Sequence, residues 1–250
     1  MKTIWVTGAS SGVGEQICEQ LKGRDVQVVK LARRYGTLQK IDKGTYTCAM
    51  DLTDVHSIHS SVSQLYDANL QPDVLINNAG IGRFASSWDL SDDDVQTMFQ
   101  LNMIGVIQLT NRVVPHMKKN KSGHIIQLAS LAGKVATAKA SVYAGTKHAL
   151  LGYSNGLRLE LKPYHVSVSV INPGPIDTPF LQAADKTGSY SDNMGAHLLQ
   201  ADQVAERVIQ TLETKKREVN LPRALGILGK LYQLAPHFIE GIGKPFFYKK

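Results

Sequence analysis

Residues 2–21, KTIWVTGASSGVGEQICEQL, decide the fold, because they join a strand, a glycine turn and a helix with no linker between them. Residues 2–8 are centred on the apolar run Ile4–Val6, and an amphipathic segment, 12–22, begins within the glycine turn. A buried strand that passes directly into a helix is the first part of a β-α-β unit, from which parallel sheets are built. The remaining sequence shows whether this alternation continues.

The alternation continues to about residue 222. Apolar runs predict five more strands, at 26–32, 45–50, 73–79, 124–130 and 166–172, and a last short strand is expected at 217–222. Longer segments between them predict helices at 54–69, 94–120, 143–162 and 201–214, and Pro163 ends the third of these. We therefore predict an α/β fold, a doubly wound parallel (Rossmann) sheet of about seven strands with helices on both faces.

The chain has the composition of an ordinary globular protein, with 43% hydrophobic and 20% charged residues. No linker rich in Pro, Gly or Ser divides it, so we expect one domain over 1–250, with 221–250 as a basic, partly apolar C-terminal extension. The two cysteines, Cys18 and Cys48, show no metal-ligand spacing, so no metal site is expected. We expect a cytoplasmic location, because the sequence has only two cysteines, no long apolar signal core and no apolar run long enough to cross a membrane.

The net charge of +7 is distributed unevenly along the chain. Residues 211–250 contain eight Lys and Arg against three Glu, which is +5 of the +7. The excess therefore belongs to the end of the chain rather than to a face that reads nucleic acid, and no nucleic-acid-binding motif accompanies it. We expect no nucleic-acid partner.

The glycine turn has the form of a nucleotide site. Gly8 permits the tight turn off the strand, Gly12 lets the backbone approach a pyrophosphate, and Gly14 lets the helix pack closely on the sheet. The helix N-terminus then offers N–H groups and a positive dipole end to phosphates. A glycine turn with no ligand is the alternative. The candidate cofactor-binding residues of this turn are Gly8, Ser10, Ser11, Gly12, Val13 and Gly14.

The end of the second strand indicates which dinucleotide binds. An acidic residue usually stands there in NAD sites, but this strand ends in Ala32, Arg33 and Arg34. A guanidinium binds a 2′-phosphate through two hydrogen bonds, so we expect NADP(H) to be preferred, with NAD(H) possible and Arg33 the better candidate. The alternative is that both arginines form a solvated strand end.

Six motifs in order make the chain resemble the short-chain dehydrogenase/reductase family over residues 3 to about 180. TGASSGVG is similar to the family's cofactor turn, NNAG at 77–80 to its signature after the fourth strand, and YAGTK at 143–147 to its YxxxK motif. NPGPIDT at 172–178 is similar to the segment that closes over the nicotinamide. Asn102 and Ser130 complete the set at family spacing.

The resemblance implies hydride transfer between a nicotinamide and a carbonyl or secondary alcohol carbon. Tyr143 would be the general acid in reduction and the general base in oxidation, with its ordinary pKa of about 10 lowered by a neighbouring cation. Lys147 would supply that cation and bind the nicotinamide ribose, and Tyr143 would also contact the bound cofactor. Ser130 would donate to the substrate oxygen, and Asn102 would break its helix locally and hold a water that connects Lys147 to solvent.

The resemblance also implies further cofactor contacts and an oligomer. Asp51 and Leu52 are candidates for the adenine edge. Asn77, Ala79 and Gly80 are candidates for the adenosine ribose side. The nicotinamide end would contact Pro173, Gly174, Ile176 and Thr178. A homodimer or homotetramer is expected through the helices at 94–120 and 143–162.

Substrate choice is the least specified feature. The polar segment 180–200 predicts a mobile, irregular lid, and further walls are expected from Ile81, Gly82, Arg83 and 131–135. In the C-terminal extension, a helical stripe of Leu225, Leu228, Tyr232 and Ala235 could pack on the substrate cleft or another subunit. Peripheral contact with an anionic membrane is the less favoured alternative.

We therefore predict an NADP(H)-dependent oxidoreductase that acts on a small-molecule carbonyl or alcohol. A sugar-nucleotide epimerase is a poorer match, because those relatives usually carry a longer C-terminal substrate domain. A function of another class is a redox-sensing regulator that binds NADP(H) without turnover. A sensor would have no need for the residues of the proton relay, which favours the enzyme.

Overall fold

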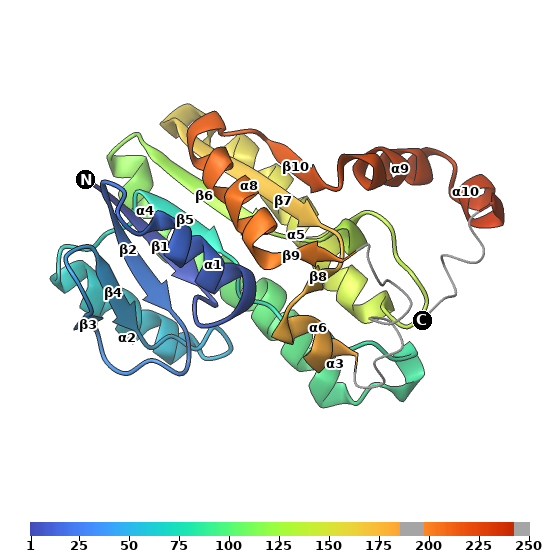
Figure 1. The fold of residues 1–250 in the computed structure, drawn as a ribbon, viewed down its shortest axis with the longest axis horizontal. Helices are drawn as coiled ribbons and strands as arrows, with labels where there is room; N and C mark the ends of the chain where they lie inside the picture. Colours follow the sequence, from blue (N-terminus) through green and yellow to red (C-terminus); the bar gives the residue numbers. More distant parts are fainter. Residues whose placement is uncertain (186–197, 243–250) are drawn as a thin grey trace.

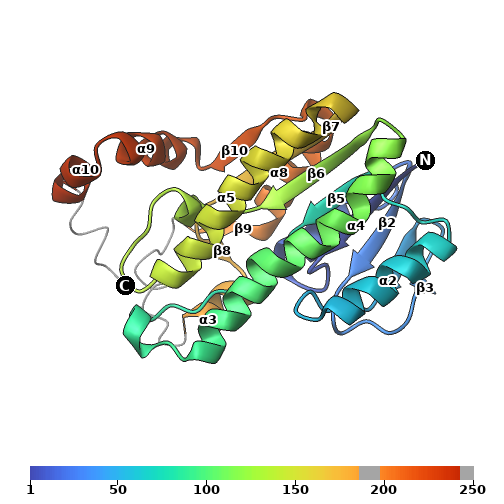
Figure 2. The same cartoon turned by 180° about the vertical axis from the view of Figure 1, so that it is seen from behind.

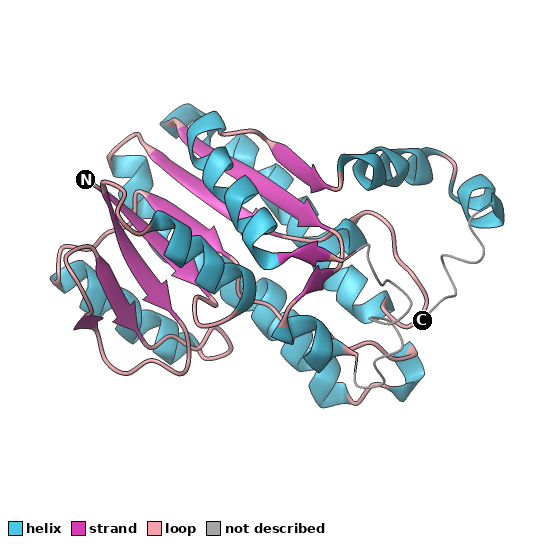
Figure 3. Ribbon diagram, in the orientation of Figure 1, coloured by secondary structure: helices cyan, strands magenta, loops and turns pink. Residues whose placement is uncertain are grey.

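The computed structural model describes residues 1–185 and 198–242. Its centre is an eight-stranded sheet in the order β10-β7-β6-β5-β1-β2-β4-β3 (Figures 1 and 3). The seven predicted strands are confirmed as β1 (Lys2–Thr7), β2 (Val26–Leu31), β4 (Thr45–Cys48), β5 (Val74–Asn77), β6 (Gly123–Leu128), β7 (Val166–Pro173) and β10 (Glu218–Leu221). The eighth, β3 (Gln39–Lys40), is a two-residue edge strand that pairs antiparallel with β4 and was not predicted.

The strand order places a crevice at one point of the sheet. From β1 the chain builds β2 and β4 on one side, then returns to build β5, β6, β7 and β10 on the other. All pairings in this sheet except β3–β4 are parallel. The carboxyl ends of β1 and β5 therefore border the position where the order reverses, which is where open α/β sheets bind their ligands.

Helices cover both faces of the sheet, as the doubly wound prediction requires (Figures 1 and 2). One face packs on α1 (Gly12–Leu21) and α8 (Ala201–Thr214) through a core that includes Ile17 and Val208. The other packs on α2 (Val55–Asp67), α4 (Gly105–Lys119) and α5 (Ser141–Leu161) through a core built around Trp5 and Leu109. Strands buried on both faces explain the continuous apolar runs in the sequence.

The helical segment predicted at 94–120 is divided in the structure. α3 (Asp92–Phe99) passes into a π turn, η2 (Gln100–Ile104), before α4 begins. Asn102 lies in this π turn, which confirms the expected local break of the helix at that residue. π turns inside α-helices occur frequently at functional sites.

Several short elements lie outside this framework. The single turns are η1 (Ser87–Asp89), η3 (Leu131–Gly133) and η4 (Lys162–Tyr164), and β8 (Ile176–Asp177) pairs with β9 (Leu199–Gln200). α6 (Pro179–Ala184) is regular helix where the sequence predicted irregular lid, because Pro179 at the first helical position favours a helix start. The rest of that predicted lid, 186–197, lies outside the described residues.

The C-terminal extension forms two helices, α9 (Arg223–Leu234) and α10 (Pro236–Ile242), that project beyond the β10 edge of the sheet (Figure 1). Residues 243–250 lie outside the described residues. Within the part of the chain that the structure describes, no helix has both the length and the apolar character to cross a bilayer.

Candidate active site

The glycine turn after β1 has the backbone geometry that was predicted for it. Gly8 and Gly12 adopt φ values of +63° and +55°, a left-handed region that glycine enters without a steric cost. Asn78, which follows β5, donates from Nδ2 to the carbonyl oxygens of Thr7 at 2.9 Å and Gly8 at 3.3 Å. Thr7 Oγ1 in return accepts from the N–H groups of Asn78 and Ala79, both at 3.0 Å. The NNAG segment thus fastens the turn to the neighbouring strand.

The start of α1 is open toward a ligand. Ser11 is its N-cap residue but makes no side-chain cap, so the first N–H groups of the helix keep their capacity for an anion. A Cβ on Gly14 would overlap the carbonyl oxygen of Gly8, which confirms the close helix approach expected there. The phenol of Tyr35, which the sequence did not single out, donates to Ala9 O at 3.2 Å and braces the turn from the loop that follows β2.

A cavity of about 850 Å³ runs along the carboxyl ends of the strands from this turn. It brings together most of the candidate residues: Gly8, Ser10, Ser11, Gly12, Val13, Arg33, Arg34, Asp51, Leu52, Ala79, Gly80, Ser130, Tyr143, Lys147, Pro173, Gly174, Ile176 and Thr178. Three candidates, Gly14, Asn77 and Asn102, lie outside its lining. Asn77 is 2% exposed and donates to Thr110 Oγ1 at 3.2 Å, so its side chain lies in the protein interior and not in the cavity wall.

The second-strand arginines lie at one end of the cavity. Arg33 and Arg34 are both exposed, and Ala32 before them is buried. Neither guanidinium makes an ion pair or hydrogen bond with another described residue. Asp51, the acidic residue of the lining, accepts from the N–H and hydroxyl of Thr53 at 2.8 and 2.7 Å. This end of the cavity therefore presents two cations that have no ionic or hydrogen-bond partner among the described residues.

Tyr143 and Lys147 lie one turn apart on α5, and both face the cavity. Tyr143 is 8% exposed and Lys147 is 4% exposed. Lys147 Nζ lies 5.8 Å from the centre of the Tyr143 ring and donates to Leu128 O at 3.0 Å. Burial lowers the pKa of Lys147 from 10.5 to about 8. The spacing in YAGTK therefore places a lysine and a phenol on one buried surface.

Ser130 and Asn102 take different positions around that pair. Ser130 caps η3, where its Oγ accepts from Ala132 N at 3.0 Å while remaining part of the cavity wall. Asn102 is 1% exposed and lies behind Gly80, where a Cβ would fall 3.1 Å from Asn102 Oδ1 and 3.5 Å from Lys147 Nζ. The expected water between Asn102 and Lys147 stays a prediction.

Two aromatic rings flank Tyr143: Phe84, which the sequence did not assign to the site, and Phe180, the first residue of the predicted lid. The Phe84 ring lies 5.8 Å from it at 71°, and the Phe180 ring lies 5.8 Å from it at 52°. Gly82 makes this possible, because a Cβ there would lie 3.0 Å from Phe180 and 3.4 Å from the Tyr143 ring. No local pattern predicts that these rings meet, because they come together only through the packing of three separate segments.

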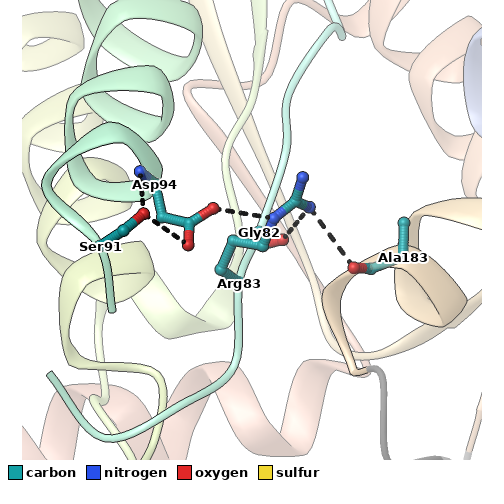
Figure 4. Close-up of polar contacts among 5 residues, drawn as sticks. All are labelled: Gly82, Arg83, Ser91, Asp94 and Ala183. Carbon is teal, nitrogen blue, oxygen red and sulfur yellow. Dashed lines mark hydrogen bonds and ion pairs between the residues drawn. The ribbon is translucent and has the colours of Figure 1, made fainter. Parts of the chain in front are cut away.

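Arg83 connects two of those segments (Figure 4). Its Nε lies 3.3 Å from Asp94 Oδ1 on α3, and Asp94 is itself held by Ser91 at the α3 N-terminus. Its Nη1 donates to the carbonyl oxygens of Gly82 at 3.1 Å and Ala183 at 3.4 Å. Since Ala183 belongs to α6, Arg83 holds the helix that carries Phe180 against the loop that follows β5.

The far end of the cavity is lined by the C-terminal helices. Leu225, Leu228 and Tyr232 on α9 and Ile239 on α10 contribute to the wall. The stripe seen in the sequence therefore packs on the cleft, the favoured expectation, except that Ala235 is exposed. Ile239 was not anticipated, because Pro236 interrupts the helical period before it.

The described residues contain no cluster of His, Cys, Asp or Glu suited to a metal ion. Cys18 and Cys48 are buried and in no disulfide, and burial raises the pKa of the Cys18 thiol to about 12. A thiol so far from ionisation is an inert part of the core.

Comparisons with known proteins agree with this geometry. The family model described as short chain dehydrogenase matches residues 2–188. Human dehydrogenase/reductase SDR family member 7 is 34% identical over 191 residues, 72% of this chain and 56% of that protein. The 3-ketodihydrosphingosine reductase of Bacteroides thetaiotaomicron is 31% identical over 89% of this chain and 80% of its own length. The NADP-dependent 3-hydroxy acid dehydrogenase of Schizosaccharomyces pombe is 29% identical over 87% and 89%.

Solved structures show the same fold. A short-chain dehydrogenase from Streptomyces avermitilis matches with a TM-score of 0.82 at 22% identity, over 98% of each chain. A serine dehydrogenase complexed with NADP⁺ matches with a TM-score of 0.79 at 26% identity, over 87% of this chain and 93% of that one.

Proposed function

The chain belongs to the short-chain dehydrogenase/reductase family, and we propose that it is an NADP(H)-dependent oxidoreductase of carbonyls or secondary alcohols with Tyr143 as general acid and base. One observation carries the proposal. Tyr143 and Lys147 are buried on one face of α5 and line the same cavity as Ser130 and the glycine turn. A proton donor, a cation and a dinucleotide cradle therefore share one enclosed space.

The residues of the turn fit a dinucleotide. The left-handed backbone at Gly8 and Gly12 and the uncapped start of α1 form a cradle for a pyrophosphate. The nicotinamide would lie toward Pro173, Gly174 and Thr178, and when bound it would give or accept the hydride. Binding the substrate oxygen and exchanging its proton would be done by side chains of the protein.

Tyr143 would exchange the proton at the substrate oxygen, and Ser130 would hold that oxygen by a hydrogen bond. Lys147 would favour the phenolate by its positive charge. Its ammonium is anchored on Leu128 O, and the rings of Phe84 and Phe180 shield part of Tyr143 from solvent. Water exclusion strengthens each of these electrostatic contacts.

The preference for NADP(H) rests on Arg33 and Arg34, whose exposed cations lack described partners at the β2 end of the cavity. The NADP dependence named for the yeast relative and the NADP⁺ bound to the serine dehydrogenase support the same choice. NAD(H) remains the alternative, since a 4-hydroxyisoleucine dehydrogenase of similar fold, 24% identical, is complexed with NADH.

We also assign the protein to the cytoplasm and to a homodimer or homotetramer. The buried, unpaired cysteines support a reducing compartment. Phe99, Ile104 and Leu159 are large apolar residues exposed on the α3–η2 and α5 segments, and they support an oligomer face there.

The test is NADPH and NADH oxidation against a panel of aldehydes, ketones, diketones and quinones. Tyr143→Phe should lower turnover roughly 100-fold to 10,000-fold and leave NADPH affinity unchanged. Tyr153→Phe, the same change on α5 outside the cavity lining, should leave turnover unchanged. Equal activity of Tyr143→Phe and wild type would overturn the proton role. NADPH binding with no turnover across the panel would favour the redox sensor.

A further inference from the structure

The cavity has two chemically different halves, because the sheet order separates its ends. Arg33, Arg34 and Asp51 lie at the β2 and β4 end, and α9 follows β10 at the opposite edge. Lys147 is the remaining charged residue among those described in the lining. From Tyr143 toward the β10 edge, the described lining therefore carries no charged side chain.

The wall beyond Tyr143 is built mainly from Leu131, Val135, Leu225, Leu228, Tyr232 and Ile239. The hydroxyl of Tyr232 donates to Glu240 Oε1 at 2.7 Å, so the ring rather than the phenol defines that part of the surface. Leu228 is 37% exposed although it lines the cavity, so its side chain is accessible rather than sealed in a core. The described part of this wall therefore offers mainly apolar contact.

Close backbone packing holds α9 in this position. A Cβ on Gly229 would lie 3.2 Å from the Cβ of Lys134, and one on Gly226 would overlap Asn220. Lys134 lies beneath the helix in an ion pair with Glu218, and Asn220 accepts from Asn172 Nδ2 at 2.9 Å. Two glycines three residues apart thus bring α9 down onto η3 and β10. The apolar wall follows from this docking.

We propose that the substrate carries its carbonyl or alcohol carbon on an uncharged apolar chain or ring system, which lies along α9 and α10. The proposal rests on the function proposed above and adds the substrate class. An apolar group placed against this wall gains roughly 0.8 kcal/mol per buried methylene, about fourfold in binding. A charged group there would lose its hydration and meet no described ionic partner.

The experiment is a homologous series from 2-butanone to 2-decanone with NADPH, together with 9-oxodecanoate, the same ten-carbon chain with a terminal carboxylate. The ratio kcat/KM should rise about fourfold per methylene over most of the series. 9-Oxodecanoate should fall well below 2-decanone. Leu228→Ala should reduce the preference for 2-decanone over 2-butanone roughly tenfold. Leu231→Ala, the same substitution on α9 outside the cavity lining, should leave that preference unchanged.

A flat series, equal use of 9-oxodecanoate, or equal effects of the two leucine variants would overturn the proposal while short ketones still turn over. If no ketone reacts, calorimetry measures the binding of 2-decanone and 9-oxodecanoate to the NADPH-loaded protein. This measurement distinguishes a failure of the proposed oxidoreductase function from a failure of the proposed substrate class. Tighter binding of 2-decanone, weakened by Leu228→Ala alone, would then support the apolar wall although the proposed reaction fails. No selectivity between the two ligands would overturn the wall as well.

Discussion

The side chain of Asn102 holds both backbone polar groups of Ile81. Its Nδ2 donates to Ile81 O at 2.8 Å, and Ile81 N–H donates to its Oδ1 at 2.9 Å. The second Nδ2 hydrogen goes to Thr146 Oγ1 at 3.1 Å, one residue before Lys147. The π turn that presents Asn102 therefore fastens the loop after β5 to α5, and the side chain that the sequence assigned to a water is engaged chiefly by protein.

Asn102→Ala should be strongly destabilising. The change removes three hydrogen bonds and leaves the polar groups of Ile81 and Thr146 without these partners, which should lower the free energy of unfolding by about 3 kcal/mol. Urea unfolding of the variant and of wild type measures this difference in the free energy of unfolding. Asn111→Ala, at an exposed position on α4, should change it by less than about 0.5 kcal/mol. Similar losses in both variants would contradict the bracing role.

Arg33→Glu should separate the two cofactors. Loss of a charge-assisted contact to a 2′-phosphate should weaken NADPH binding roughly tenfold to hundredfold, while NADH affinity stays level or improves. Fluorescence titration gives both dissociation constants. Arg207→Glu, the same charge change at an exposed site on α8, is the control. If the affinities for NADPH and NADH fell equally, Arg33 would not be the residue that recognises the 2′-phosphate.

Lys147→Met should stabilise the folded protein at neutral pH. Burial lowers the pKa of Lys147 from 10.5 to about 8, so between these values the unfolded chain binds more protons than the folded chain. The stability of wild type should therefore rise as pH increases from 8 toward 10.5, and below pH 8 the buried charge carries its full cost. Removing it should add about 2 kcal/mol at pH 7 and reduce that rise.

Melting temperatures at pH 7 and pH 9.5 test this expectation, with the exposed Lys162→Met as the matched variant. Lys162→Met should keep the wild-type dependence on pH. A Lys147→Met protein no more stable than wild type at pH 7 would show that burial of this ammonium carries no cost.

Arg83→Ala should affect turnover more than stability. Its ion pair with Asp94 is partly exposed, with side chains 33% and 39% accessible, so its loss should change the free energy of unfolding by under about 1 kcal/mol. The release of α6 should loosen Phe180 over Tyr143 and lower kcat/KM roughly tenfold. Lys22→Ala, which removes the exposed ion pair with Glu19, should change neither quantity. If kcat/KM of Arg83→Ala equals that of wild type, Arg83 has no role in positioning Phe180 over Tyr143.

Local signals explain how much of the fold and site could be predicted. Six of the seven predicted strands follow from apolar runs of the kind that a sheet covered by helices on both faces requires, and the glycine turn follows from residues that tolerate a positive φ. Tyr143 and Lys147 share a surface because residues four apart on a helix always do. The edge strand β3 and the helix α6 are short, and their local patterns were too weak to predict them.

The sequence by itself determined the order of the strands and helices, the cradle after β1, and the face of α5 that carries the phenol and the amine. Each depends on residues within about one helical turn or one strand of each other. Tertiary structure alone decided that Phe84 and Phe180 flank Tyr143, that Arg83 ties α3 to α6, and that α9 closes the far wall. These contacts join segments up to a hundred residues apart, and they form only when the parallel sheet brings the carboxyl ends of its strands to one edge.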